Sequence, residues 1–291
     1  MFEKIVLATD LSPAWDEIVA CAGEFKGLGC SQVILAHVIT VRFLAGMEAA
    51  LRKEAEPRLE EQKKILESQG LRVTVEIPFG LPAFALNEVA RRYEADLIVV
   101  GSHGKSLWRE GVLGSVSSAV LHHTVYPTLL LKIKVDEEKE KGTCRLHCTE
   151  MLGHILFPTD FSETAERALG YVERLAQRGA SRVTLLHALE APGCETYPPG
   201  YREVAEATAR HFLEKCQRHL EDARVIQVQP QLSPGHPIPV ILEALRTMDC
   251  SLIIMGTQGK GLIKEIFLGS VAHNISRLAP CPVLLIPPFR R

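Results

Sequence analysis

The chain has 291 residues, enough for one or two domains, and its 46% hydrophobic and 23% charged residues are typical of a globular protein. A formal net charge of −2 excludes the strong basic field expected of a protein that binds nucleic acid or an anionic membrane. No apolar run approaches the roughly 18 residues of a membrane-spanning helix, and the first residues lack the pattern of a signal peptide. We therefore expect a cytoplasmic protein without a membrane span.

Strand and helix patterns alternate along the first half of the chain. An apolar run at residues 5–9 ends at Asp10, and Ser12-Pro13 then has the residue types of a helix start. The pattern next predicts strands at residues 33–39, 73–77, 97–100 and 128–133, and helices at residues 47–69, 82–93 and 112–123. Such alternation predicts a parallel sheet with helices on both faces.

The second half repeats the first. The run that ends at Asp160 matches the run that ends at Asp10 with an offset of 150, and Gly256 matches Gly101 with an offset of 155. One loop insertion near Tyr197 accounts for the change of offset. The sequence therefore predicts two copies of one domain, at residues 1–134 and 151–291. The charged segment at residues 135–150 has little to bury and is interpreted as the linker.

Each half also contains the same glycine motif after its fourth predicted strand. The first copy is Gly101-Ser-His-Gly104 followed by Gly114-Ser115, and the second is Gly256-Thr-Gln-Gly259 followed by Gly269-Ser270. Glycines between a strand and a helix allow tight turns and close approach of the backbone, and the amides at a helix start attract anions. The repeated spacing favours a phosphate site over two ordinary turns, and Lys105 and Lys260 are candidate contacts to a terminal phosphate.

Asp10 and Asp160 each end a first strand. If the strand order is 3-2-1-4-5, they share a crevice with the glycine motifs, because ligands bind where the strand order reverses. A carboxylate there can accept hydrogen bonds from ribose hydroxyls or an adenine amino group, and the alternative is a helix cap.

His37 and His187, which end the second strands, are interpreted as histidines whose rings have internal partners.

The eight cysteines do not form a disulfide pattern, and several are expected to be small buried side chains. In the linker, Cys144, His147 and Cys148, with His154 nearby, have the side-chain types of zinc ligands. Their spacing is not that of a zinc finger, so no metal site is predicted and these residues stay weak candidates. The alternative is that the cysteines form a disulfide or are free thiols.

These motifs together resemble the universal stress protein family. The resemblance rests on the two strand-end aspartates, the repeated Gly-x2-Gly-x9-Gly-Ser motif, the opening Pro158-Thr-Asp-Phe-Ser and the closing Pro282-Val-Leu-Leu. It covers both halves and omits the linker, as in members with tandem domains. It implies two Rossmann-like α/β domains, each with five parallel strands in the order 3-2-1-4-5, that bind an adenine nucleotide.

The resemblance also implies which residues contact the nucleotide. In the first half they are Ala8, Thr9, Asp10, Val38, Val100, Gly101, Gly104, Gly114, Ser115, Val116 and Ser117. In the second half they are Pro158, Thr159, Asp160, Ala188, Met255, Gly256, Gly259, Gly269, Ser270 and Val271, with Ala272 in place of the hydroxyl of Ser117. The ligand would be ATP, ADP or AMP, with Mg²⁺ as a candidate companion, and the first site would bind more tightly.

Three functions remain in competition. The favoured one is a nucleotide-binding stress-response module with slow ATP hydrolysis at most, because no carboxylate pair or general base flanks the glycine motif. An ATP-using enzyme of the adenylating or pyrophosphatase type would need a Ser-Gly-Gly-x-Asp-Ser loop where the chain has Ala-Thr-Asp-Leu-Ser. A phospho-receiver domain would need paired acidic residues at the end of its first strand, where this chain has single aspartates.

The resemblance also has an implication for assembly. Family members commonly dimerise through the last strand, which implies an intramolecular pairing of the two domains and a candidate homodimer.

Overall fold

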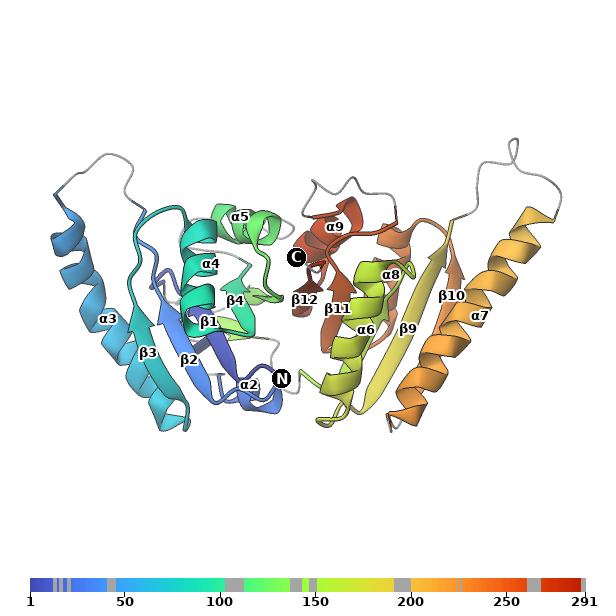
Figure 1. Cartoon of the computed structure of the whole chain (residues 1–291), viewed down its shortest axis with the longest axis horizontal. Helices are drawn as coiled ribbons and strands as arrows, with labels where there is room; N and C mark the ends of the chain where they lie inside the picture. The colour runs from blue at the N-terminus through green and yellow to red at the C-terminus, as the bar shows by residue number, and fades with distance from the viewer. Residues whose placement is uncertain are drawn as a thin grey trace. The chain divides into compact units, whose positions relative to one another are not determined.

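A computed structural model of the chain describes residues 1–12, 15, 18–19, 22–40, 46–102, 113–136, 143–146, 151–190, 200–223, 225, 227–260 and 268–288. The chain divides into two compact units, residues 1–149 and 150–289. Both units have the mixed α/β architecture expected from the alternating strand and helix patterns (Figure 1).

The sheet of the first unit has five parallel strands. They are β1 (Lys4–Ala8), β2 (Gln32–Ala36), β3 (Arg72–Glu76), β4 (Leu97–Gly101) and β5 (Thr128–Leu131). Their hydrogen-bonded order is β3-β2-β1-β4-β5, which is the expected 3-2-1-4-5 order. β1 and β4 are almost completely buried, as expected for central parallel strands that are covered on both faces.

The sheet of the second unit repeats this order as β10-β9-β8-β11-β12. The strands are β8 (His154–Pro158), β9 (Arg182–Leu189), β10 (Val228–Pro234), β11 (Leu252–Gly256) and β12 (Val283–Ile286). All of the pairs between them are parallel. In both units the reversal of strand order therefore falls between the first and the fourth strand, where the sequence places the aspartate and the glycine motif.

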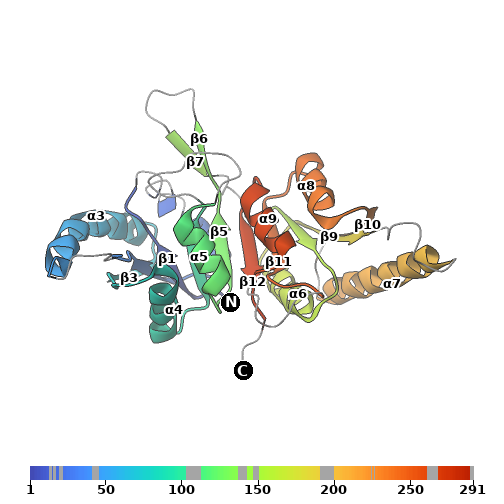
Figure 2. The ribbon, with the colours of Figure 1, turned by 90° about the horizontal axis from the view of Figure 1, so that it is seen from above.

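Helices cover the two sheets. The first unit contains α2 (Glu24–Gly27), α3 (Glu48–Ser68), α4 (Pro82–Tyr93) and α5 (Ser115–His123). The second contains α6 (Glu163–Ala176), α7 (Tyr201–Asp222), α8 (Pro237–Thr247) and α9 (Ser270–Leu278). In the second unit, α6 and α7 cover one face of the sheet and α8 and α9 the other (Figure 2). Among the described residues, no helix is both long enough and apolar enough to cross a bilayer.

Two sequence-based boundaries differ from the structure. The fifth strand was expected to reach Ile133, but β5 ends at Leu131, and β6 (Ile133–Asp136) pairs antiparallel with β7 (Thr143–Leu146). Part of the predicted linker is thus a two-stranded ribbon. Whether two short segments pair as strands depends on whether the fold brings them together. The charge pattern of each segment does not predict this. The helix expected from Ser12 lies mostly outside the described residues.

Four cysteines of the described residues have side chains that are partly or fully buried. Cys30 and Cys281 are buried and Cys216 and Cys250 are partly buried, as expected for small core side chains. Burial raises the pKa of the Cys30 thiol to about 12 and that of Cys250 to about 11. Both thiols are therefore protonated and poorly reactive at neutral pH.

A buried histidine lies at the amino-terminal edge of the second sheet. His154 is 4% exposed, and its Nε2 lies 2.8 Å from Oγ1 of Thr184 while its Nδ1 lies 3.8 Å from Sγ of Cys250. The sequence suggested His154 as a weak candidate metal ligand near the linker. In the structure its ring lies between Thr184 and Cys250. Burial, reinforced by the charge of Arg182, lowers the pKa of His154 below its ordinary value of 6.5.

This histidine predicts a pH dependence of stability. Because its pKa is lower in the folded state, the unfolded chain binds more protons between the two pKa values. The stabilising contribution is therefore complete above the unfolded pKa of 6.5 and decreases as the pH falls below it. Urea unfolding followed by far-ultraviolet circular dichroism should show the second unit weakening between about pH 7.5 and pH 5.5. The His154→Gln variant should show a smaller change, and an equal change would contradict this assignment.

Candidate functional site

The predicted site of each unit is at the carboxyl edge of its sheet. β1 pairs with β4 in a register that joins Leu7 to Val99, so Asp10, which follows β1, and Gly101, which ends β4, lie at the same edge. In the second unit Leu156 pairs with Ile253, which brings Asp160 and Gly256 to the same edge. The strand order thus brings together residues that are about one hundred positions apart in the sequence.

The turn after each first strand has the same backbone geometry in both units. The carboxylate Oδ1 of Asp10 accepts a hydrogen bond from the amide of Ser12 at 2.9 Å, and Asp160 accepts one from Ser162 at 3.0 Å. The residue after each aspartate has a positive φ, 60° at Leu11 and 59° at Phe161. Left-handed backbone is costly for residues other than glycine, so the rest of each unit must hold this turn in place.

Histidines near the carboxyl ends of β2 and β9 support the same turns. Nδ1 of His37 donates to the carbonyl oxygen of Thr9 at 2.8 Å, and Nδ1 of His187 donates to that of Thr159 at 2.7 Å. The expectation that these rings have internal partners is confirmed. Burial lowers the pKa of His187, with the charge of Lys260 acting in the same direction, so its ring is neutral and is a positioning group for the turn.

In the second unit the aspartate contacts the glycine motif directly. The amide of Lys260 donates to Oδ2 of Asp160 at 2.9 Å. A Cβ at Gly259 would lie 2.6 Å from the same oxygen, so a side chain at this position would force the carboxylate of Asp160 to move. A Cβ at Gly256 would lie 3.0–3.2 Å from atoms of Thr164 at the start of α6. Neither glycine is in the left-handed region, so these two glycines are required for close packing and not for an unusual φ.

The last glycine of each motif begins a helix in both units. The amide of Gly114 donates to the carbonyl oxygen of Ser102 at 2.9 Å, and that of Gly269 donates to Thr257 at 2.7 Å. α5 and α9 then begin at Ser115 and Ser270. Neither helix has a side-chain cap, so the first amides at the crevice are available to an anion.

Ser117 has an internal hydrogen-bond partner. Its hydroxyl is buried and donates to the carbonyl oxygen of Gly101, which joins α5 to the end of β4. The neighbouring Ser115 and Val116 are exposed. The absence of a hydroxyl at Ala272 therefore removes an internal tether of the second unit in this structure, whereas the sequence comparison interpreted it as the loss of a phosphate contact.

The remaining predicted residues divide into two groups. The first group lies at or beside the carboxyl ends of the strands and consists of Ala8, Thr9, Val38, Val100, Pro158, Thr159, Ala188 and Met255. Val271 lies in the first turn of α9. Gly104, with His103 and Lys105, lies outside the described residues, as do His147 and Cys148, while Cys144 is in β7. Within the described residues no group of three or more histidine, cysteine, aspartate or glutamate side chains is placed to hold a metal ion.

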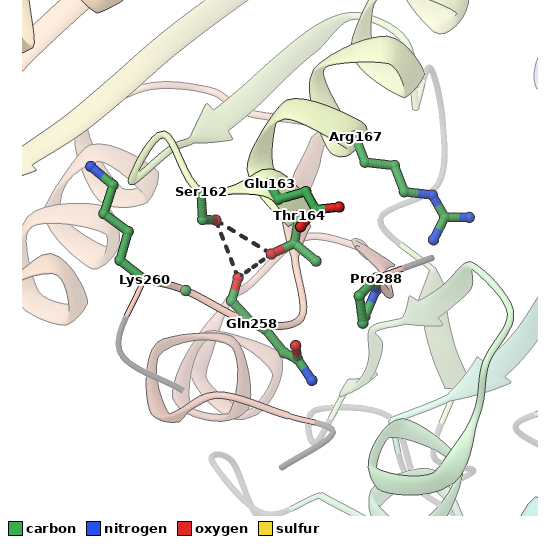
Figure 3. Close-up of a pocket in the computed structure, with 8 residues that line it drawn as sticks. Ser162, Glu163, Thr164, Arg167, Gln258, Lys260 and Pro288 are labelled. Atoms are coloured by element: carbon green, nitrogen blue, oxygen red, sulfur yellow. Dashed lines mark hydrogen bonds between the residues drawn. The ribbon is translucent and has the colours of Figure 1, made fainter. Parts of the chain in front are cut away.

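A pocket of about 240 Å³ opens beside the second site. It is lined by the start of α6, by residues 258–260 and by Pro288 (Figure 3). Sequence reasoning identified Gly259 and Lys260 in this wall but missed Thr164 and Arg167. A threonine and an arginine at the start of an amphipathic helix carry no signal that distinguishes them from ordinary surface residues.

Comparison with known proteins agrees with this architecture. The model of the universal stress protein family matches residues 1–132 and 151–287. The chain belongs to the universal stress protein family.

Relatives of this family match either one unit or the whole chain. A universal stress protein of Methanocaldococcus jannaschii is 31% identical over 155 residues, which are 47% of this chain and 95% of the relative. One from Mycolicibacterium smegmatis is 24% identical over 298 residues and matches 98% of this chain and 97% of its own length. The crystal structure of a universal stress protein from Archaeoglobus fulgidus superposes with a TM-score of 0.75 at 24% identity, and the match covers 98% of each chain. The resemblance to the tandem members is confirmed.

Proposed function

We propose that each unit binds an adenine nucleotide at the carboxyl edge of its sheet and that the chain is a nucleotide-dependent stress-response module. The observation that carries the proposal is the 2.9 Å hydrogen bond between Asp160 and the amide of Lys260. A carboxylate suited to a ribose and a glycine loop suited to phosphates therefore meet within one crevice. The equal turn geometry at Asp10 extends the proposal to the first unit.

The proposed site favours binding over rapid catalysis. Asp160 is the carboxylate at the centre of the described site, and the ring of His187 already donates to Thr159. A fast phosphoryl transfer needs a base that positions the nucleophile as well as charges that neutralise the phosphates. We therefore propose slow ATP hydrolysis at most. Four further expectations stay predictions. They are that Mg²⁺ accompanies the nucleotide, that the protein is cytoplasmic, that the two units pair through β5 and β12, and that the chain forms a homodimer.

The test is to identify what the protein carries and what it binds. The full chain is purified without added nucleotide and denatured, and the released small molecules are identified and counted. We expect ATP, ADP or AMP at up to about two per chain, one for the crevice of each unit. If nothing is released, and if Gly104→Asp combined with Gly259→Asp leaves the affinity for added ATP unchanged, the proposal is wrong. Turnover of many ATP molecules per second would instead favour the adenylating or pyrophosphatase type of enzyme.

A further inference from the structure

In the second unit, residues 258–260 are fastened to the turn that carries Asp160. The carbonyl oxygen of Gln258 accepts a hydrogen bond from Oγ1 of Thr164 at 2.6 Å and a longer one from Oγ of Ser162 at 3.4 Å. The amide of Lys260 donates to Asp160 at 2.9 Å. We call this set of contacts the clasp, and its hydroxyl-to-carbonyl bonds are drawn in Figure 3.

The side chain of Lys260 adds a further contact to the clasp. Its Nζ lies 5.5 Å from the centre of the Phe161 ring, within the range of a cation–π interaction. The same ring lies 4.5 Å from that of His187 and 5.1 Å from that of Phe212. Lys260 is thus directed at an aromatic cluster, and its chain in Figure 3 extends away from Arg167 and Pro288.

Two of the residues that make the clasp have no equivalent in the first unit. At the 150-residue offset, Thr164 corresponds to Ala14 and Phe161 corresponds to Leu11. Alanine has no hydroxyl to donate to the loop carbonyl, and leucine has no ring for a lysine. The sequence of the first unit therefore lacks the groups for the shortest hydrogen bond of the clasp and for its cation–π contact.

The clasp covers the carboxylate that a nucleotide would use. Oδ1 of Asp160 is bound to Ser162, Oδ2 is bound to Lys260, and the backbone at Gly259 lies so close to Oδ2 that a Cβ would be 2.6 Å away. The loop backbone therefore occupies the approach to Oδ2 from the side of the glycine motif, and the Lys260 amide takes one of the acceptor positions of Oδ2. A ribose hydroxyl that approaches Oδ2 from this side would have to displace residues 258–260.

We propose that the clasp is an autoinhibitory contact that closes the second nucleotide site, so that nucleotide binds there only after the hydrogen bonds to Thr164 and Asp160 have opened. This inference rests on the proposed function. The apparent affinity of the second site equals its intrinsic affinity multiplied by the fraction of molecules in which the clasp is open. Weakening the clasp therefore increases the affinity, whereas weakening an ordinary binding contact decreases it.

The decisive variant is Thr164→Val, which removes the hydroxyl and keeps the shape of a side chain that is 6% exposed. It is made in the full chain with Gly104→Asp, which places an acidic side chain in the first glycine motif. Calorimetric titration should show ATP binding to the second site about two- to tenfold more tightly, the factor that corresponds to one hydrogen bond of the closed state. In the nucleotide-free protein, hydrogen exchange at the Lys260 amide should become faster, because its opening is then more frequent.

Two further variants keep the test decisive. Phe161→Leu introduces the residue that the first unit has at this position, where Leu11 adopts the same positive φ, and it should also increase the affinity. Thr247→Val removes another threonine hydroxyl that donates to a carbonyl, on α8, and should change neither the affinity nor the exchange. Unchanged or weaker ATP binding in Thr164→Val and Phe161→Leu would overturn the inference alone. Absence of ATP binding in the wild-type chain and in every variant would overturn the proposed function, and the inference with it.

Discussion

Replacing Gly256 with valine is expected to destabilise the second unit by about 3 kcal/mol, the upper part of the range for overpacked interiors. The Cβ would lie 3.0 Å from Cβ of Thr164 and 3.1 Å from its carbonyl carbon. Backbone atoms at the start of α6 cannot move aside as the end of a flexible side chain can. Because β11 lies next to β8 in the centre of the sheet, α6 must shift for the valine to fit.

The positions of the tryptophans separate the two units in this measurement. The two tryptophans of the chain, Trp15 and Trp108, are both in the first half, so their fluorescence reports on the first unit while far-ultraviolet circular dichroism reports on both. In Gly256→Val only the dichroism transition should move to lower urea concentration. Gly170→Ala is the matched control, because Gly170 is inside α6 with nothing within 4 Å of its Cβ position. It should stabilise the same unit by roughly 0.5–1 kcal/mol, and equal effects of the two changes would contradict the packing argument.

Asp10→Asn is expected to weaken nucleotide binding at the first site by roughly tenfold or more, since a hydrogen bond to a charged group contributes about 1.5–3 kcal/mol. The amide oxygen of asparagine can still accept the hydrogen bond from Ser12. The turn is therefore retained and only the charge and one acceptor are lost. Calorimetric titration with ATP should show one weakened site per chain and one unchanged site.

Asp222→Asn provides the control for the loss of a negative charge. Asp222 ends α7 and is exposed, so this variant should bind ATP as the wild-type chain does. If Asp10→Asn behaves in the same way, the carboxylate at the end of β1 is not a ligand contact and is only the cap of its turn. Unfolding curves of both variants should overlap the wild-type curve, which separates an effect on binding from an effect on folding.

The fold was predictable because its signals are local and repeated. The helix expected at residues 82–93 is α4, from Pro82 to Tyr93, since a proline suits its first turn and its last turn carries Arg91 and Arg92. The strand order was implied by the family resemblance, and the aspartate and the glycine motif fit it because both need the same edge of one sheet. By contrast, the β6–β7 ribbon forms only because the fold places two segments side by side. The charges within either segment do not predict this pairing.

The site was predictable in its backbone and less so in its side chains. Asp160 and Gly259 meet as the motifs indicated, at a separation that leaves no room for a Cβ at Gly259 unless the carboxylate moves. The hydrogen bond from Ser117 to Gly101 and the contacts of Thr164 depend on how α5 and α6 are set against the sheet. Rotation of a helix by one residue would redirect both hydroxyls, and hydrophobic periodicity defines a helix face only to about that precision.

The positive φ at Leu11 and Phe161 has a consequence for how each unit assembles. A turn of four residues cannot by itself keep a leucine or a phenylalanine in left-handed backbone, because the penalty of about 1–2 kcal/mol exceeds what one turn hydrogen bond provides. The strand before the turn and the histidine that donates to it stabilise this backbone. We therefore expect the aspartate to reach its final geometry late in the folding of a unit, after the first strand has paired with the second and the fourth.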